Sequence, residues 1–185
     1  MRLILLGAPG SGKGTQAAIL ADRLGVSSIS TGEMLREAVS AGTALGDKVK
    51  AILATGELVD DETMVEVVRG RLSQPDAQGG FILDGYPRTL GQADTLSAIL
   101  QEQNWSLDAV VYIEVPEEEL IKRALARQRA DDQEEVIRQR QRVYRQQTQP
   151  LIDYYETQDL LCAIDGHQTI EEVARSVIAG LEVVS

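Results

Sequence analysis

The sequence has few aromatic residues, a single cysteine and no long apolar run. Aromatic side chains make up 4% of its 185 residues, so a hydrophobic core must consist mainly of Leu, Ile, Val and Ala. The lone Cys162 excludes an internal disulfide framework and a four-cysteine zinc site. Its apolar neighbours instead predict a buried strand residue. No apolar run is long enough to span a bilayer, and the chain enters a strand-like segment at once without a leader. We therefore expect a soluble, cytoplasmic protein with no membrane partner.

Basic residues are also scarce relative to acidic ones. The chain has 18 Lys and Arg against 29 Asp and Glu, a formal net charge of −11. This excess argues against nucleic acid or an anionic membrane as the main partner. The apolar fraction of 43% supports a real core, and the length suits one domain.

Short apolar segments alternate with segments of helical spacing along the whole chain. The predicted strands are Arg2–Leu6, Ser27–Ser30, Gly80–Leu83, Ala109–Val115 and Leu160–Ile164. The predicted helices are Lys13–Leu24, Gly32–Ala41, Leu45–Ala54, Asp61–Ser73, Leu90–Gln103, one opened by Pro116, one capped by Asp132, a short one over Leu151–Tyr155 after a break at Pro150, and a last one begun by Thr169 and Glu172. This alternation predicts an α/β fold, a five-stranded parallel sheet with helices on both faces.

The most informative segment is Gly7-Ala8-Pro9-Gly10-Ser11-Gly12-Lys13-Gly14-Thr15, between the first strand and the first helix. Its glycines let backbone N–H groups point inward, the following helix adds partial positive charge, and Lys13 adds a full one. This is the arrangement that binds a phosphate chain, and a plain glycine turn is the weaker interpretation. Gly14 stands where a magnesium-binding Ser or Thr is usual, so metal ligation by Thr15 is an open alternative.

A second signal is Asp84-Gly85-Tyr86-Pro87-Arg88, directly after an apolar strand. Ligands of parallel sheets sit at the carboxyl ends of the strands, so we expect Asp84 to lie near the phosphate loop. A carboxylate there can hold magnesium through water. Without the phosphate loop, an Asp-Gly pair would more often mark a turn.

The segment from Arg123 to Arg145 is rich in arginine and contains seven of the chain's arginines. We expect Arg138, Arg142 and Arg145 to lie on a solvated face beside glutamates. The four others, Arg123, Arg127, Arg129 and Arg140, fall where two predicted helices meet. Arginines that converge need an anion between them, and phosphate fits the guanidinium fork.

Taken together, the motifs resemble those of adenylate kinases with a short lid. The motifs are Gly7 to Gln16, Ser30-Thr31-Gly32-Glu33-Met34-Leu35-Arg36, Asp84 to Arg88 with Gln92, and Arg129-Ala130-Asp131-Asp132-Gln133-Glu134-Glu135. They cover nearly the whole chain in order. Glu33, Tyr86 and Asp60 depart from the usual Asp, Phe and Pro, and none of these changes removes a charge that the chemistry needs.

The resemblance implies a P-loop NTPase fold of three layers: one kinase domain over residues 1–185, with an AMP-binding segment at 30–59 and a short lid at 126–132. It implies ATP contacts from Gly10, Ser11, Gly12, Lys13, Gly14, Thr15, Arg123, Arg127 and Gln168. It implies AMP contacts from Thr31, Arg36, Glu57, Leu58, Val59, Gly85, Tyr86, Pro87, Arg88, Gln92, Arg129 and Arg140. It also implies catalysis by Lys13, Arg88, Arg123, Arg127, Arg129 and Arg140.

The implied reaction is Mg·ATP + AMP ⇌ 2 ADP, a reaction of adenine nucleotide homeostasis, by a monomer with Mg²⁺ near Asp84 and no zinc. The attacking phosphate oxygen is already ionised, so no protein base is required. A UMP/CMP kinase is the nearest alternative, although Thr31 and Gln92 favour AMP. A shikimate- or gluconate-type kinase would not need Asp84 to Arg88 with Gln92, and a guanine-nucleotide switch would carry an Asn-Lys pair, which this chain lacks.

Overall fold

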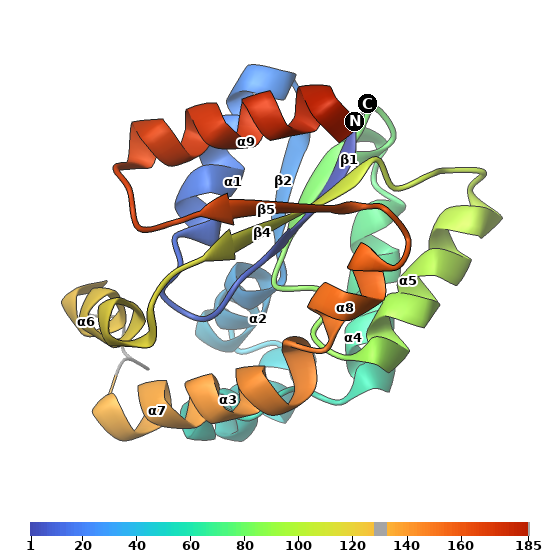
Figure 1. The fold of residues 1–185 in the computed structure, drawn as a ribbon. Helices are drawn as coiled ribbons and strands as arrows, with labels where there is room; N and C mark the ends of the chain where they lie inside the picture. The colour runs from blue at the N-terminus through green and yellow to red at the C-terminus, as the bar shows by residue number, and fades with distance from the viewer. Residues whose placement is uncertain (128–132, 185) are drawn as a thin grey trace.

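The structure, a computed structural model, describes residues 1–127 and 133–184. At its centre is one parallel sheet of five strands in the order β2-β3-β1-β4-β5 (Figure 1). The strands are β1 (Arg2–Leu6), β2 (Ser27–Ser30), β3 (Phe81–Asp84), β4 (Ala109–Glu114) and β5 (Leu161–Asp165). All neighbouring strands pair in parallel, which confirms the predicted α/β architecture.

The three central strands, β1, β3 and β4, are buried on both faces, and successive residues of a strand point to opposite faces. In β1, Leu3 and Leu5 join one hydrophobic cluster, whereas Ile4 and Leu6 join the other. Cys162 lies buried on β5, as predicted, and burial raises the pKa of its thiol. Two separate cores therefore hold the sheet between layers of helices.

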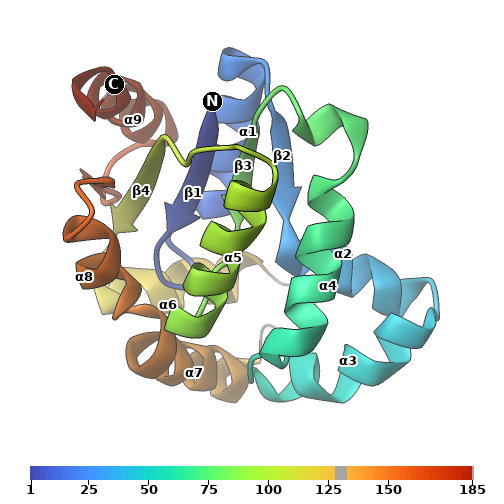
Figure 2. The same cartoon turned by 90° about the vertical axis from the view of Figure 1, so that its right-hand side faces the viewer.

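Two helices cover one face of the sheet, and three others cover the opposite face (Figure 2). The first layer consists of α1 (Lys13–Leu24) and α9 (Ile170–Val184), and the second of α4 (Asp61–Leu72), α5 (Leu90–Glu102) and α8 (Leu151–Glu156). Each layer packs through an apolar stripe, such as Ala17 and Leu20 of α1. In the part of the chain that the structure describes, no helix is long and apolar enough to cross a membrane.

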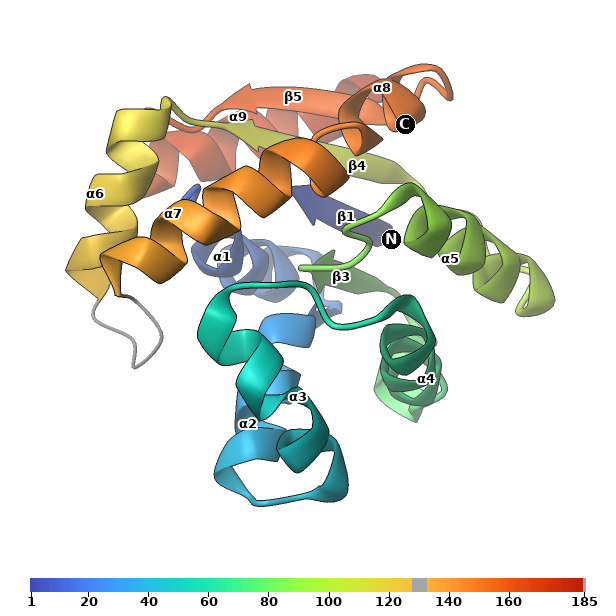
Figure 3. The same ribbon diagram turned by 90° about the horizontal axis from the view of Figure 1, so that it is seen from below.

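The remaining helices lie beyond the carboxyl ends of the strands. Figure 3 shows α2 and α3 projecting away from the sheet, while α7 runs across its end. Their bounds are α2 (Thr31–Ser40), α3 (Ala44–Thr55), α6 (Glu117–Arg127) and α7 (Glu134–Val143), and α7 continues into the π-helix η2 (Tyr144–Thr148). This outer group surrounds the end of the sheet where ligands of parallel sheets bind.

Most predicted boundaries agree with the structure to within one residue. Thr169 and Glu172 form a reciprocal capping box before α9, since each side chain bonds the other's backbone N–H. Pro150 ends the helical run before α8, as predicted. The predicted cap, Asp132, lies outside the described residues; α7 begins at Glu134, with Gln133 in the N-cap position. Neither η2 nor the short 3₁₀ helix η1 (Pro75–Ala77) was predicted.

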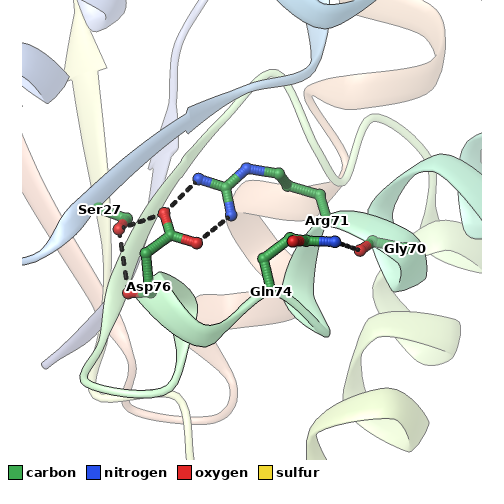
Figure 4. A network of polar contacts seen from close by, with 5 residues as sticks. All are labelled: Ser27, Gly70, Arg71, Gln74 and Asp76. Atoms are coloured by element: carbon green, nitrogen blue, oxygen red, sulfur yellow. Dashed lines mark hydrogen bonds and ion pairs between the residues drawn. The ribbon is translucent and has the colours of Figure 1, made fainter.

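An ion pair anchors the end of α4 to the edge strand (Figure 4). Arg71 donates two hydrogen bonds to the Asp76 carboxylate, at 2.9 and 2.6 Å. Ser27 at the start of β2 donates to the same carboxylate at 2.8 Å. These hydrogen bonds, with Arg71 first, hold the pKa of Asp76 below its usual value. Gln74 adds a bond to the Gly70 carbonyl at the end of the helix.

Two helical glycines make a matched test of the packing between α2 and α3. A Cβ on Gly46 of α3 would overlap the carbonyl of Ala38 in α2, whereas a Cβ on Gly70 of α4 would meet nothing within 4 Å. We predict that Gly46→Ala lowers the free energy of unfolding by about 1–3 kcal/mol through overpacking. Gly70→Ala should raise it by about 0.5–1 kcal/mol, because alanine loses less entropy in a helix.

Urea unfolding followed by circular dichroism measures both changes. Stabilisation by both substitutions would contradict the close packing of α3 against α2.

Candidate active site

The phosphate loop joins β1 to α1 and carries its lysine inside the turn. The Lys13 ammonium donates to the carbonyls of Gly7 and Ala8, at 2.7 and 3.1 Å. Gly10 has φ +95°, and a Cβ there would lie 2.5 Å from the carbonyl oxygen of Leu120. Gly12, the N-cap of α1, is also left-handed. Glycine is thus required by the geometry at two positions, and the loop presents the amino end of α1 with Lys13 beside it.

The predicted neighbourhood of Asp84 and this loop is present. Asp84 ends β3, where it pairs in register with Leu5 of β1 and Ser30 of β2. Its carboxylate oxygen Oδ2 accepts from the Ser30 hydroxyl at 3.3 Å and lies 3.5 Å from the ideal Cβ position of Gly14. One carboxylate therefore sits beside the first turn of α1.

Arg88 follows Asp84 on a loop that is tied down at several points. Its Nε donates to the carbonyl of Gly85 at 2.7 Å. Its backbone N–H donates to the Gln92 side chain at 2.7 Å, and its carbonyl accepts from the Thr148 hydroxyl at 2.8 Å. The Tyr86–Pro87 peptide bond is cis. Burial of the Tyr86 side chain raises the pKa of its phenol to about 12, and the Asp61 charge adds to this rise. The three hydrogen bonds made by Arg88 restrict the direction in which its guanidinium points.

Guanidinium groups from separate elements converge on one cavity of about 770 Å³. Arg36 comes from α2, Arg88 from the β3 loop and Arg140 from α7, and the phosphate loop lines the same cavity. Burial lowers the pKa of Arg88, the charges of Arg140 and Arg36 lower it further, and Asp84 opposes them. The three positive charges therefore repel one another, and an anion between them would relieve that repulsion.

Arg123 and Gln168 line the cavity near the last strand. Arg123 of α6 donates to the carbonyl of Gly166 at 3.1 Å and pairs with Glu119 at 2.9 Å. Gln168 donates to Asp165 at 3.2 Å. Arg129 and most of the predicted lid, 126–132, lie outside the described residues, as does the side chain of Arg127.

The other predicted site residues divide into two groups. Those that line the cavity are Gly10, Ser11, Gly12, Lys13, Gly14, Thr15, Glu57, Leu58, Gly85 and Pro87. Those that do not line it are Thr31, Val59, Tyr86 and Gln92. The Thr31 hydroxyl donates to the Gly85 carbonyl at 2.9 Å. The Gln92 side-chain oxygen accepts from the Arg88 backbone N–H at 2.7 Å, while its amide N–H donates to Asp61 at 2.8 Å. Both side chains thus support the Arg88 loop, a function that the sequence analysis did not predict; their predicted contacts with an AMP base stay predictions.

Arg138, Arg142 and Arg145, which were predicted to lie on a solvated face, are exposed, and two of them pair with glutamates. Arg138 bonds Glu134 at 2.8 Å, and Arg145 bonds Glu117 at 2.9 Å. Arg142 bonds Gln139 at 2.6 Å. The cavity therefore receives only some of the crowded arginines.

The cavity is suited to a chain of phosphates, because basic side chains predominate over acidic ones among the described residues that line its phosphate end. Among the described residues that line it, the acidic ones are Glu33, Glu57 and Asp84, and none is histidine. Also within the described residues, no group of three or more His, Cys, Asp or Glu is placed to hold a metal ion. The arrangement can bind, align and stabilise phosphate groups by charge.

Comparison with known proteins adds an independent line of support. Residues 5–160 match the family model described as adenylate kinase. The chain is 46% identical to the adenylate kinase of Archaeoglobus fulgidus, over 98% of each chain. It is 46% identical to that of Nocardia farcinica, over 98% of this chain and 99% of the relative. It is also 46% identical to that of Synechococcus sp. strain WH7803, over 97% of this chain and 98% of the relative.

Proposed function

This chain belongs to the adenylate kinase family, and on that premise we propose how its cavity performs the family's reaction, ATP + AMP ⇌ 2 ADP. The observation that carries the proposal is the convergence of Arg36, Arg88 and Arg140 with the phosphate loop on one cavity. Two nucleotides bring enough phosphates to contact both the phosphate loop and the three arginines. We assign the phosphate loop to ATP and the side near α2 to AMP.

On the ATP side, backbone N–H groups of residues 10–15 and the Lys13 ammonium bind the phosphates. We assign the adenine to the region of Arg123 and Gln168, and we assign Arg127 to the ATP phosphates. On the AMP side, Arg36 and Arg88 bind the phosphate, while Glu57, Leu58 and Val59 border the nucleoside. Arg129 and Arg140 hold phosphates from the lid side.

The transfer needs alignment rather than a protein base. An ionised oxygen of the AMP phosphate attacks the γ-phosphorus of ATP, and the bond from that phosphorus to the bridging oxygen breaks. ADP leaves with the electron pair, and the acceptor becomes a second ADP. Lys13, Arg88 and Arg140 stabilise the charge on the transferring group.

Asp84 fits the Mg²⁺ that accompanies ATP. Mg²⁺ prefers oxygen ligands and keeps several waters, so one carboxylate beside the phosphate loop suffices to hold it through water. The Ser30 hydroxyl bonds the same carboxylate, and Thr15 lies at the cavity wall. When bound, the ion would supply positive charge to the phosphates.

We further propose that the 30–59 segment and the 126–132 lid close over the nucleotides. The α2–α3 pair projects from the sheet, and a hydrogen bond joins Glu57 to Gln139 of α7 at 2.6 Å. Closure excludes water, which would otherwise accept the phosphoryl group. We propose that the protein acts as a monomer, since one chain provides both sides of the cavity. We also propose that it acts in the cytoplasm.

The first prediction concerns Arg88, which the loop holds against the cavity. Arg88→Ala should lower kcat by about 10³-fold, the scale of losing an arginine that stabilises the transition state. Arg138→Ala is the matched control, because Arg138 is exposed and pairs with Glu134. The measurement is steady-state ADP formation by variants whose unfolding curves match wild type. A folded Arg88→Ala variant with the kcat of the control would show this assignment to be wrong.

A second prediction concerns the choice of acceptor. Wild type should prefer AMP to UMP, CMP, GMP and shikimate in a coupled assay with Mg·ATP. Thr31→Ala should lower kcat/KM for AMP by about tenfold, the effect of losing one hydrogen bond. It should also reduce the ratio of kcat/KM for AMP to kcat/KM for UMP or CMP. Thr31→Ser keeps the hydroxyl and should remain close to wild type. A wild-type preference for a pyrimidine nucleotide would replace this proposal with a UMP/CMP kinase.

A further inference from the structure

The helical segment formed by α7 and η2 contacts both loops that line the phosphate end of the cavity. The Gln141 side-chain amide donates to the carbonyl of Pro9 in the phosphate loop at 2.7 Å. The Thr148 hydroxyl donates to the carbonyl of Arg88 at 2.8 Å. Gln141 lies in α7 and Thr148 at the end of η2, so both donors come from one continuous helical segment.

Both donors are buried, which makes their hydrogen bonds matter. Gln141 is 3% exposed and Thr148 is 8% exposed. A buried polar group without its partner carries a desolvation penalty, so each side chain strongly favours the one loop position that completes its bond. These bonds join residues 132 and 60 positions apart in the chain. Sheet pairing cannot replace them, because Pro9 and Arg88 lie beyond the ends of β1 and β3.

The same segment also contacts the opposite side of the cavity. Arg140, the neighbour of Gln141, lines the cavity and donates to the carbonyl of Leu53 in α3 at 3.4 Å. Gln139 bonds Glu57. The segment formed by α7 and η2 therefore contacts the phosphate loop, the Arg88 loop and the segment assigned to AMP.

We propose that Gln141 and Thr148 are positioning residues for phosphoryl transfer. They fix the phosphate loop and the Arg88 backbone to a single helical segment, and so set the spacing between the donor phosphates and the Arg88 guanidinium. Gln141 does not line the cavity; Thr148 does, but its hydroxyl is engaged with the Arg88 carbonyl. This inference rests on the proposed function, since it assigns the donor phosphates to the loop and the acceptor phosphate to Arg88.

The inference predicts a particular division between rate and binding. Removing either hydrogen bond leaves every positive charge in the cavity, so ground-state binding should change little. The transition state requires closer alignment than the bound substrates do, and small displacements of catalytic groups cost large factors in rate. The rate of the transfer step should therefore fall much more than the affinity.

The decisive experiment measures phosphoryl transfer in a single turnover by rapid quench, so that product release does not hide the chemical step. Thr148→Val keeps the shape but removes the hydroxyl, and should slow transfer by about 10- to 100-fold with dissociation constants for ATP and AMP within about threefold of wild type. Thr148→Ser should restore the rate. The matched control is Thr157→Val, since the exposed Thr157 hydroxyl bonds only the nearby Tyr154 carbonyl, at 2.9 Å.

Gln141→Met provides the second, independent variant, and Gln158→Met is its control. Gln158 makes the same kind of bond, from a side-chain amide to the Tyr154 carbonyl at 3.1 Å, but on an exposed surface. Gln141→Met should slow transfer on the same scale, so the inference stays testable if Thr148→Val does not fold. Transfer rates of folded Thr148→Val or Gln141→Met equal to their controls would overturn the inference. Wild type that fails to transfer phosphate from ATP to AMP would instead overturn the proposed function.

Discussion

The repulsion among arginines at the end of the sheet is the constraint on which the site depends. Arg36, Arg88 and Arg140 reach one cavity from three different elements. Burial lowers the pKa of Arg88 most, the charges of Arg140 and Arg36 lower it further, and Asp84 opposes them. Such a cluster adds nothing to the stability of the folded chain by itself, since like charges and desolvation both oppose it. The surrounding hydrogen bonds hold the arginines in place. A bound phosphate neutralises their charges and removes the repulsion, which favours binding. These arginines concentrate positive charge at one cavity of a chain whose net charge is −11.

The rest of the fold provides fixed points for these charges. Parallel strands buried on both faces end at one edge, where register places Asp84 opposite Leu5 and Ser30. Short loops then extend from those ends: the phosphate loop from β1 and the Arg88 loop from β3. Gln92, Thr31 and Thr148 bond the second loop from three directions. The geometry that a transfer reaction needs is thus built from backbone N–H and carbonyl groups held by buried side chains.

The sequence predicted the fold and the phosphate loop well because both are encoded locally. The alternation of apolar segments predicted the five strands to within one residue. The phosphate loop was recognisable because its positive φ angles require glycine at particular positions, and these glycines can be read directly from the sequence. Gln141 was not predicted because its partner Pro9 lies 132 positions away, and only the packing of α7 across the sheet brings them together. The π-helix before Pro150 was missed because helical periodicity does not distinguish it from α-helix.

The central claim is that one cavity aligns two nucleotides with their phosphates between the phosphate loop and the arginines. The most direct test is a crystal structure of the full chain with Mg²⁺ and a ligand that joins two adenosines through five phosphates. The account predicts one phosphate chain running from residues 10–15 and Lys13 to Arg36, Arg88 and Arg140, with the metal near Asp84 and one adenosine on each side. A ligand bound through a single adenosine, with Arg36 and Arg88 remote from every phosphate, would contradict it.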